Sequence, residues 1–376
     1  MKYPPFCPNP GCDFHQQPPD RSSWFVRNGS YLSKAFGRIQ RFLCNACSHG
    51  FSSMTFSTQY YVKVPVPLSD IFNRLKSTSG IRHIARDLGV SHTIILNRCT
   101  RLARQALAVH ATLSSSISLA EDLVTDGFES FVYSQYYPNN IHLLVGSTSQ
   151  YLYALDYAHM RRKGRMTEAQ KVRRAELDEL WISGKRSIRR SFTAIVEAIE
   201  QLVKDRSTGA TVLYSDEKYA YRLAVNRNEY LMRLQTEESF RHVRISSKKP
   251  RTVHNKLFAV NYYDREIRKD NANHVRETVQ YSRNVNNCME RMAIYRVYHN
   301  YVKPYRITDR TDEKRLHGEV AGIERQRIEG EMGSIFTERR FLTRVSLSWS
   351  DALIWLRGLA TPTMHEGGTF PGYAWA

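Results

Sequence analysis

Two stretches of the sequence decide the predicted fold: LVTDGFESFVY at residues 123–133 and ATVLYSD at residues 210–216. Both have the apolar, β-branched and aromatic composition of a strand. The first contains Asp126, and the second ends on Asp216. An aspartate near a strand end is by itself often only a turn former. The order of the elements between the two strands therefore has to decide whether these residues belong together.

Three predicted strands, a helical region and a fourth strand make up this order. IHLLVG at 141–146 and YLYALDY at 151–157 follow the first stretch as an antiparallel meander would. A capping box at Thr167 and Gln170 opens the helical region, which we treat as an insertion over 160–207. The order predicts an α/β protein with an RNase H-like core at 119–305. In such a sheet the first and fourth strands are neighbours.

Adjacent strands would bring the carboxylates of Asp126 and Asp216 together, which is the arrangement that nucleic-acid phosphoryl transfer requires. Oxygen ligands hold two divalent ions about 3.5–4 Å apart, one activating the nucleophile and one stabilising the leaving oxygen. The sequence therefore predicts a site for Mg²⁺ or Mn²⁺ at these two aspartates.

A third acid is expected on a helix after a fifth strand, which we place at FRHVRIS, residues 240–246. In the following run Asp264 shares one helical face with Val260 and Ile267, so we expect its carboxylate to point toward the sheet. The same helix carries three cations that we expect to face outward, toward DNA phosphates: Arg265, Arg268 and Lys269.

Glu290, in NNCMERMAIYRVYHNY, is the competing candidate for the third acid because it shares a face with Ile294 and Val297. Either acid could instead be a salt-bridge partner of nearby arginines, as charged helix residues usually are. We favour Asp264 over Glu290.

Four cysteines near the N-terminus form two short knuckles, CPNPGC with Cys7 and Cys12, and CNAC with Cys44 and Cys47. This spacing is typical of a ribbon that presents four thiolates to one tetrahedral zinc, and we assign residues 1–60 to it. The alternative is four unrelated reduced cysteines. His15 and His49 lie close by in the sequence and could replace a thiolate, but we expect both at the surface.

A helix-turn-helix is predicted within residues 61–115, from the segment GIRHIARDLGVSHTIILNRCTRLARQALA at 80–108. Gly89 suits the tight turn and Ser91 the cap of the second helix, on which Cys99 is expected to be a small core residue. An ordinary helical hairpin is the alternative. If the motif binds DNA, five outward residues should contact bases and phosphates: His92, Thr93, Asn97, Arg98 and Arg101.

The charge balance also favours a nucleic-acid partner. The 376 residues include 55 lysines and arginines against 36 acids, a formal net charge of +19. No run of about 18 apolar residues and no signal-peptide pattern occurs, so we expect a soluble, cytoplasmic protein associated with the nucleoid. The small polar stretch 111–118 is the predicted linker, and residues 306–376 form a helical extension and tail.

Taken together, these motifs resemble those of a known family. The order of C-x4-C, C-x2-C, FSSMTF at 51–56, a helix-turn-helix and TDGFESF at 125–131 is similar to bacterial insertion-sequence DDE transposases related to the IS-one type. RETVQYSRN at 276–284 is similar to the block that follows the third acid in those enzymes. The resemblance puts the third acid in NYYDREIR. The family usually has glutamate there, whereas Asn261 is the nearest equivalent here, with Asp264 one turn later.

The resemblance implies a transposase that recognises terminal inverted repeats in double-stranded DNA. It also implies hydrolysis that frees a 3′-hydroxyl, attack of that hydroxyl on target DNA, and a homo-oligomer that holds two ends together. Two other functions remain open from the residues alone. One is a DNA-binding regulator on an inactive nuclease fold, and the other is a structure-specific nuclease that joins no strands.

Overall fold

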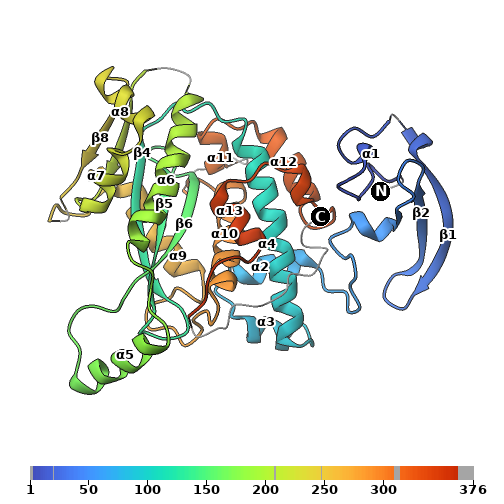
Figure 1. The fold of residues 1–376 in the computed structure, drawn as a ribbon, viewed down its shortest axis with the longest axis horizontal. Coiled ribbons are helices and arrows are strands. Elements are labelled where there is room, and N and C mark those ends of the chain that lie inside the picture. Colours follow the sequence, from blue (N-terminus) through green and yellow to red (C-terminus); the bar gives the residue numbers. More distant parts are fainter. Residues whose placement is uncertain (1–2, 20, 207–208, 247, 309–313, 363–376) are drawn as a thin grey trace.

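The computed structural model describes residues 3–19, 21–206, 209–246, 248–308 and 314–362, and it has a mixed α/β fold (Figure 1). A five-stranded sheet with helices around it forms the larger part. A small three-stranded sheet, β1-β2-β3, from the N-terminal part of the chain stands apart at the right of the view. None of the helices in the described ranges combines the length and the apolar character needed to cross a bilayer.

The central sheet has the strand order β6-β5-β4-β7-β8. Its strands are β4 (Leu123–Phe131), β5 (Pro138–Gly146), β6 (Leu152–His159), β7 (Thr211–Ser215) and β8 (Phe240–Arg244). The first three pair antiparallel, and β7 and β8 add to β4 in parallel. Each predicted strand is present, and the predicted adjacency of the first and fourth strands is confirmed.

Alternation along β4 sends its side chains to opposite faces of the sheet. Val124 and Phe128 pack with α9 (Phe258–Asp270) and α10 (Val285–Tyr301) on one face, whereas Leu123 packs on the other face with α6 (Ser187–Lys204). The capping box predicted at Thr167 begins α5 (Glu168–Leu180), so this part of the helical insertion is confirmed. Residue parity therefore decides which helix each β4 side chain meets.

The N-terminal sheet consists of β1 (Phe25–Ser33), β2 (Gly37–Cys44) and β3 (Gly50–Ser52), all antiparallel. It packs over a small aromatic cluster that includes Trp24, Phe42 and Phe51. The same cluster contains Phe341 from the C-terminal part of the chain. The aromatic core of the N-terminal sheet is thus completed by a residue that follows the sheet by about three hundred positions in the sequence.

The helix-turn-helix region contains α2 (Leu68–Leu75), α3 (Ile81–Asp87) and α4 (His92–Ser114). At 23 residues, α4 continues far beyond a reading helix and packs along α10. One hydrophobic cluster runs from α2 and α3 through α4 into the central sheet. The expected linker at 111–118 therefore begins inside α4, and the units expected at 61–115 and 119–305 share a core.

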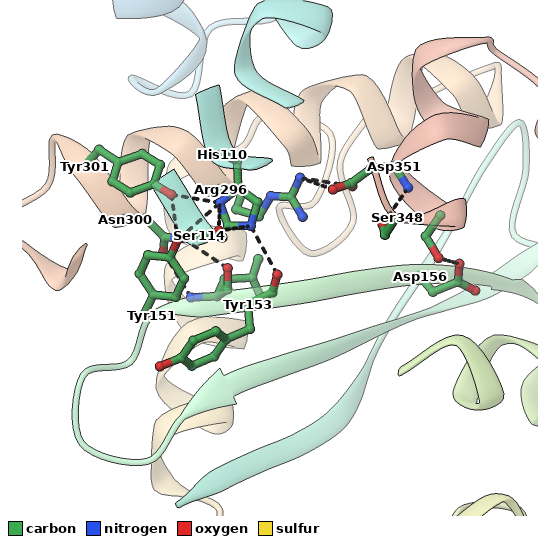
Figure 2. Close-up of polar contacts among 12 residues, drawn as sticks. His110, Ser114, Tyr151, Tyr153, Asp156, Arg296, Asn300, Tyr301, Ser348 and Asp351 are labelled. Carbon is green, nitrogen blue, oxygen red and sulfur yellow. Dashed lines mark hydrogen bonds and ion pairs between the residues drawn. The ribbon is translucent and has the colours of Figure 1, made fainter. Parts of the chain in front are cut away.

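Buried polar contacts also fasten α4 to the sheet (Figure 2). His110 of α4 is hydrogen-bonded to Tyr301 of α10 at 3.0 Å, and Tyr301 is hydrogen-bonded to Tyr151 beside β6 at 2.6 Å. On the same helix α10, Arg296 donates to the carboxylate of Asp351 at 2.9 Å. Because these groups are buried, each contact would leave an unsatisfied polar group if it broke. These contacts consequently hold α4, α10 and β6 in fixed positions relative to one another.

The remaining elements are short helices and turns: α1 (Asp13–Gln16), α7 (Tyr219–Val225), α8 (Glu229–Thr236), α11 (His317–Val320), α12 (Arg325–Ser334), α13 (Trp349–Trp355) and the 3₁₀ turns Arg21–Trp24, Ser53–Phe56 and Leu342–Arg344. The expected C-terminal extension is helical. Most of the tail expected at its end, residues 363–376, lies outside the described residues.

Candidate active site and metal centre

Asp126 and Asp216 are brought together by the register of two parallel strands. The last paired residues of β4 and β7 are Thr125 and Ser215, and each aspartate is the next residue of its chain segment. By parity both carboxylates belong to the face covered by α9. One ammonium group, that of Lys218, lies 3.8 Å from Asp126 Oδ1 and 3.4 Å from Asp216 Oδ2. Both carboxylates are therefore within reach of one cation.

Asp264 joins the pair from α9. It lies between Val260 and Ile267, which are fully buried against the sheet, so the predicted helical face is present. Its Oδ1 is buried and has no hydrogen-bond partner. Burial and the negative charge of Asp126 raise the pKa of Asp264 to about 7. We call Asp126, Asp216 and Asp264 the carboxylate cluster.

The pKa of Asp126 is also raised, first by burial and then by the charge of Asp216, against the opposing effect of Lys218. A raised carboxyl pKa means that the charged form is poorly solvated. The positive charges of Lys218, Arg251 and Arg268 offset part of this effect. A bound cation would stabilise the charged forms of these carboxyl groups further.

All donor atoms of the carboxylate cluster are oxygens, the ligands that hard divalent cations prefer. The three carboxylates do not lie as close together as the ligands of a single ion. Among the described residues, only the cysteines form a set of three or more ligand atoms within 4.8 Å of one another. Two ions about 4 Å apart, with bonds of about 2 Å, would separate outer ligands by roughly 6–8 Å. A single ion could therefore not take a ligand atom from all three residues as they stand, whereas two ions would tolerate a wider spacing.

Lys218 and Tyr221 belong to this site although the sequence analysis did not single them out. Tyr221 is fully buried, and burial together with the charges of Asp126 and Asp216 raises the pKa of its phenol. Lys218 Nζ lies 3.5 Å from the Tyr221 hydroxyl. Both residues follow Asp216 within five positions in the sequence. A lysine and a tyrosine at such positions do not by themselves indicate a functional site.

Replacing Asp264 by asparagine should stabilise the protein in buffer without added divalent ions, by about 1–3 kcal/mol at pH 8. The folded pKa of about 7 lies above the ordinary value. Stability contributed by the protonated form is therefore complete at acidic pH and is lost as the pH rises toward 7. Denaturant titrations at pH 5 and pH 8 measure this, and a variant whose advantage is equal at both pH values would contradict it.

Glu290 does not belong to the carboxylate cluster, which removes the alternative third acid. Its side chain is almost completely buried and forms an ion pair with Arg357 on the far side of α10 from the sheet. The helical face it shares with Ile294 and Val297 packs against α4 and the C-terminal segment. Glu290 is the internal salt-bridge partner that the sequence analysis considered for either acid.

Replacing Glu290 by glutamine should lower the free energy of unfolding by about 1–3 kcal/mol, because it leaves the half-buried Arg357 without its counter-charge. The matched control is Glu176→Gln, which removes a carboxylate from an exposed pair with Arg173 and should change little. Urea denaturation of both variants is the measurement. Equal effects at the two positions would argue against a buried structural pair.

The three cations expected to face outward from α9 differ in the direction of their side chains and in their exposure. Arg265 and Lys269 are exposed and lie 3.7 Å and 3.6 Å from the carboxylate of Glu266. Arg268 instead turns toward the sheet, where it donates to the carbonyl oxygen of Glu129 at 3.0 Å and stacks over Phe128. The prediction for Arg268 is therefore corrected, because its guanidinium finds backbone acceptors on β4.

The four N-terminal cysteines form a buried cluster that could bind a structural metal such as zinc. Their sulfurs lie within 4.8 Å of one another, with Cys7 and Cys47 at 3.6 Å and Cys12 and Cys44 at 3.8 Å. All four are free thiols. Zn–S bonds of about 2.3 Å in a tetrahedron place sulfurs about 3.8 Å apart. The spacing thus fits such an ion without rearrangement.

His15 is not at the surface, contrary to expectation. It is fully buried, and its ring is hydrogen-bonded to the carbonyl oxygen of Cys7 at 2.7 Å and to the Thr343 hydroxyl at 2.8 Å. It supports the cysteine cluster from outside and joins it to the C-terminal segment. His49 is exposed, as expected.

The proposed DNA-contacting residues of α4 divide into two groups. His92, Thr93 and Asn97 are exposed. Arg98 is buried and donates to the carbonyl oxygen of Val64 at 3.0 Å, and Arg101 donates to Thr58 and Tyr60 carbonyl oxygens. These two arginines hold the segment that precedes α2, so their assignment to DNA is corrected. The three exposed residues of the five all lie in the first two turns of α4.

No protein-family model matches this chain, and no curated protein matches it. Its function has to be inferred from the carboxylate cluster, the cysteine cluster and the surfaces around them.

Proposed function

We propose that this protein is an insertion-sequence transposase that cuts and joins DNA with divalent metal ions. The observation that carries the proposal is the carboxylate cluster. Asp126 lies within β4 and Asp216 directly follows the neighbouring parallel strand β7, and Asp264 turns a buried, unpartnered oxygen to the same face. Buried acids without compensating partners are uncommon outside sites that bind cations or catalyse reactions.

The strand order supports an RNase H-like assignment for the core. Three antiparallel strands are extended by two parallel ones on the side of the first strand, and helices cover both faces. The acids come from the first strand, the end of the fourth strand and the helix after the fifth. This is the order that the sequence predicts for such a core.

The donor set fits Mg²⁺ or Mn²⁺, which would be held by Asp126, Asp216 and Asp264. Bound there, two such ions supply a water or 3′-hydroxyl with a lowered pKa and stabilise the leaving oxygen of the phosphodiester. Lys218 neutralises part of the charge at the first two acids. Asp264, whose carboxyl pKa is raised to about 7, would provide further oxygen ligands in its ionised form.

Contact with double-stranded DNA is supported by the net charge of +19 and by the exposed first turns of α4. His92, Thr93 and Asn97 are the residues that we assign to base contacts. A transposase would act as a homo-oligomer on two DNA ends, in the bacterial cytoplasm at the nucleoid. The cysteine cluster, with zinc bound, would serve as a further DNA-contacting module.

A second candidate is a DNA-binding regulator that keeps the fold without the activity. The observation that favours it is the separation of the three carboxylates, which do not form a compact group. The transposases that the sequence resembles usually have a glutamate as the third acid. The aspartate at position 264 therefore also favours an inactive site. A regulator would bind DNA and leave it intact in the presence of Mg²⁺ and Mn²⁺.

The deciding experiment uses the DNA that flanks the coding region. Sequencing should find inverted repeats next to a short target duplication, and these repeats then provide labelled duplex substrates. With Mg²⁺ and a target plasmid, a transposase forms strand-transfer products, a structure-specific nuclease forms only cut ends, and a regulator forms neither. Absence of any metal-dependent product from the repeats would reject the proposal.

A further inference from the structure

A groove of about 870 Å³ lies between the helix-turn-helix and the segment that follows the acid-bearing helix. One wall consists of α3, the turn after it and the start of α4. The other wall consists of residues 279–283 and two side chains of α10, Asn287 and Arg291. The groove therefore joins elements that are almost two hundred residues apart in the sequence.

The groove is strongly basic. Four arginines line it, together with two histidines and no acidic residue: Arg82, Arg86, Arg283 and Arg291. Within the described ranges, none of these guanidinium groups has a hydrogen bond or an ion pair. Asp87, the acid nearest in sequence to the first pair, is engaged by Arg74 instead. Four guanidinium groups that line one groove without a protein partner favour an anionic occupant.

Arg291 makes the strongest case. Its side chain is partly buried, and burial lowers the pKa of its guanidinium. Partial burial leaves less room for water around its five donors, and the described part of the protein supplies no hydrogen-bond acceptor to them. An acceptor that arrives from outside the protein would satisfy these donors.

A second groove, on the other side of the start of α4, lacks this property although its volume of about 760 Å³ is similar. Its arginines are occupied by the protein. Arg98 and Arg101 donate to backbone carbonyls, Arg104 donates to the Trp355 carbonyl, and Arg357 pairs with Glu290. Among the described residues that line the second groove, only Lys63 is a cation without a protein partner, whereas the first groove has four such arginines.

Three contacts fix the basic groove relative to the carboxylate cluster. Thr78, just before α3, donates from its amide to the Asp270 carbonyl at the end of α9. The side chain of Gln280 lies so close to Gly80 that any β-carbon there would overlap it. The Tyr133 amide, just after β4, donates to the Ser282 carbonyl at 2.8 Å. Both walls are thus tied to the elements that carry Asp126 and Asp264.

We propose that this groove binds the phosphate backbone of double-stranded DNA and sets its position relative to the carboxylate cluster. Guanidinium groups bind phosphate oxygens in pairs and remain charged at any pH at which the protein works. A DNA strand bound here would contact the helix-turn-helix and, at the same time, residues 279–283, which follow the helix that carries Asp264. The inference rests on the proposed transposase function. That function requires contacts with DNA phosphates, and the inference assigns them to this groove.

The test compares two double variants of the zinc-loaded full-length chain. Arg82→Ala with Arg283→Ala removes two exposed cations of the groove, and Arg227→Ala with Arg241→Ala removes two exposed cations near α7 and β8. Binding of a fluorescein-labelled 30-base-pair duplex of arbitrary sequence is measured by anisotropy from 50 to 200 mM KCl without Mg²⁺. The groove variant should lose about tenfold or more in affinity, and its log–log salt slope should fall by about 2.

Arg291→Met extends the test to the partly buried arginine and should lower the slope by about 1. Far-UV circular dichroism and the thermal midpoint check that each variant is folded. A groove variant with wild-type affinity and slope, or a control variant with an equal loss, would overturn the inference. The proposed function fails separately, through absence of metal-dependent cleavage by the wild-type chain, whereas the binding comparison involves no cleavage.

Discussion

Replacing Asp126 or Asp216 by asparagine is expected to lower the rate of Mg²⁺-dependent DNA cleavage by about three orders of magnitude, or about 4 kcal/mol of transition-state stabilisation. Each substitution removes one carboxylate of the cluster and keeps the shape of the side chain. DNA affinity in the absence of metal should stay within about twofold, because neither residue lies in the basic groove or among the α4 residues that we assign to base contacts. Single-turnover cleavage of labelled duplex is the measurement.

Asp205→Asn is the matched control for this pair. Asp205 is an exposed aspartate at the end of α6, and its replacement changes the net charge by the same amount. Its cleavage rate should equal that of the wild type. If Asp126→Asn or Asp216→Asn retained wild-type cleavage, the carboxylate cluster would not be the catalytic centre.

Removing the metal from the cysteine cluster is the second change with a large expected effect. Structural zinc supplies about 10 kcal/mol or more of folding free energy in small zinc-binding peptides. The hydrophobic cluster beneath β1–β3 is small, so the ribbon should unfold when zinc is removed with a chelator or when Cys44 is replaced by serine. Trypsin should then cut rapidly at Arg27, Arg38 and Arg41, while the central sheet stays resistant.

Cys99→Ala is the control, because Cys99 is a buried thiol of the α4 core and not a member of the cluster. It should retain one zinc per chain and wild-type protection of the ribbon. Zinc content is measured by elemental analysis beside the digestion. A Cys44→Ser protein that keeps full zinc content and an intact ribbon would show that the cysteine cluster does not hold a structural ion.

The parts of the fold that the sequence predicts are those encoded by local patterns. The five strands come from short stretches that contain apolar and aromatic residues, and their order along the chain predicts that Asp126 lies next to Asp216. The helical period over α9 predicts that Asp264 lies on the buried face, where its Oδ1 is found. Cysteine spacing predicts the cluster of four thiols. In each case the information lies within about a dozen residues of the group concerned.

The parts that the sequence does not predict depend on partners far along the chain. Arg98 and Arg101 have the residue types and helical phase of DNA-contacting side chains, but the segment at 58–64 folds back and takes their hydrogen bonds. His15 is buried because the segment with Thr343, which is far away in the sequence, packs against it. The shared core of the helix-turn-helix and the sheet likewise arises from α4 packing along α10. None of these contacts leaves a periodic signal.

The same reason explains why Lys218 and the basic groove escape sequence reasoning. A lysine after Asp216 gains meaning only when β4 brings Asp126 beside it. Arg82 and Arg283 gain theirs only when residues 279–283 pack against α3. Arginines at a distance of two hundred residues can be recognised as one surface in the folded chain alone.

Diffraction from crystals grown with Mn²⁺ and duplex DNA, recorded for its anomalous signal, would show directly whether the carboxylate cluster binds divalent ions. We expect one or two manganese peaks between Asp126 and Asp216, with an oxygen of Asp264 as a further ligand at about 2.2 Å. Peaks at the cysteine cluster alone, or manganese bound elsewhere with the three carboxylates free of it, would reject a metal-dependent site at these residues.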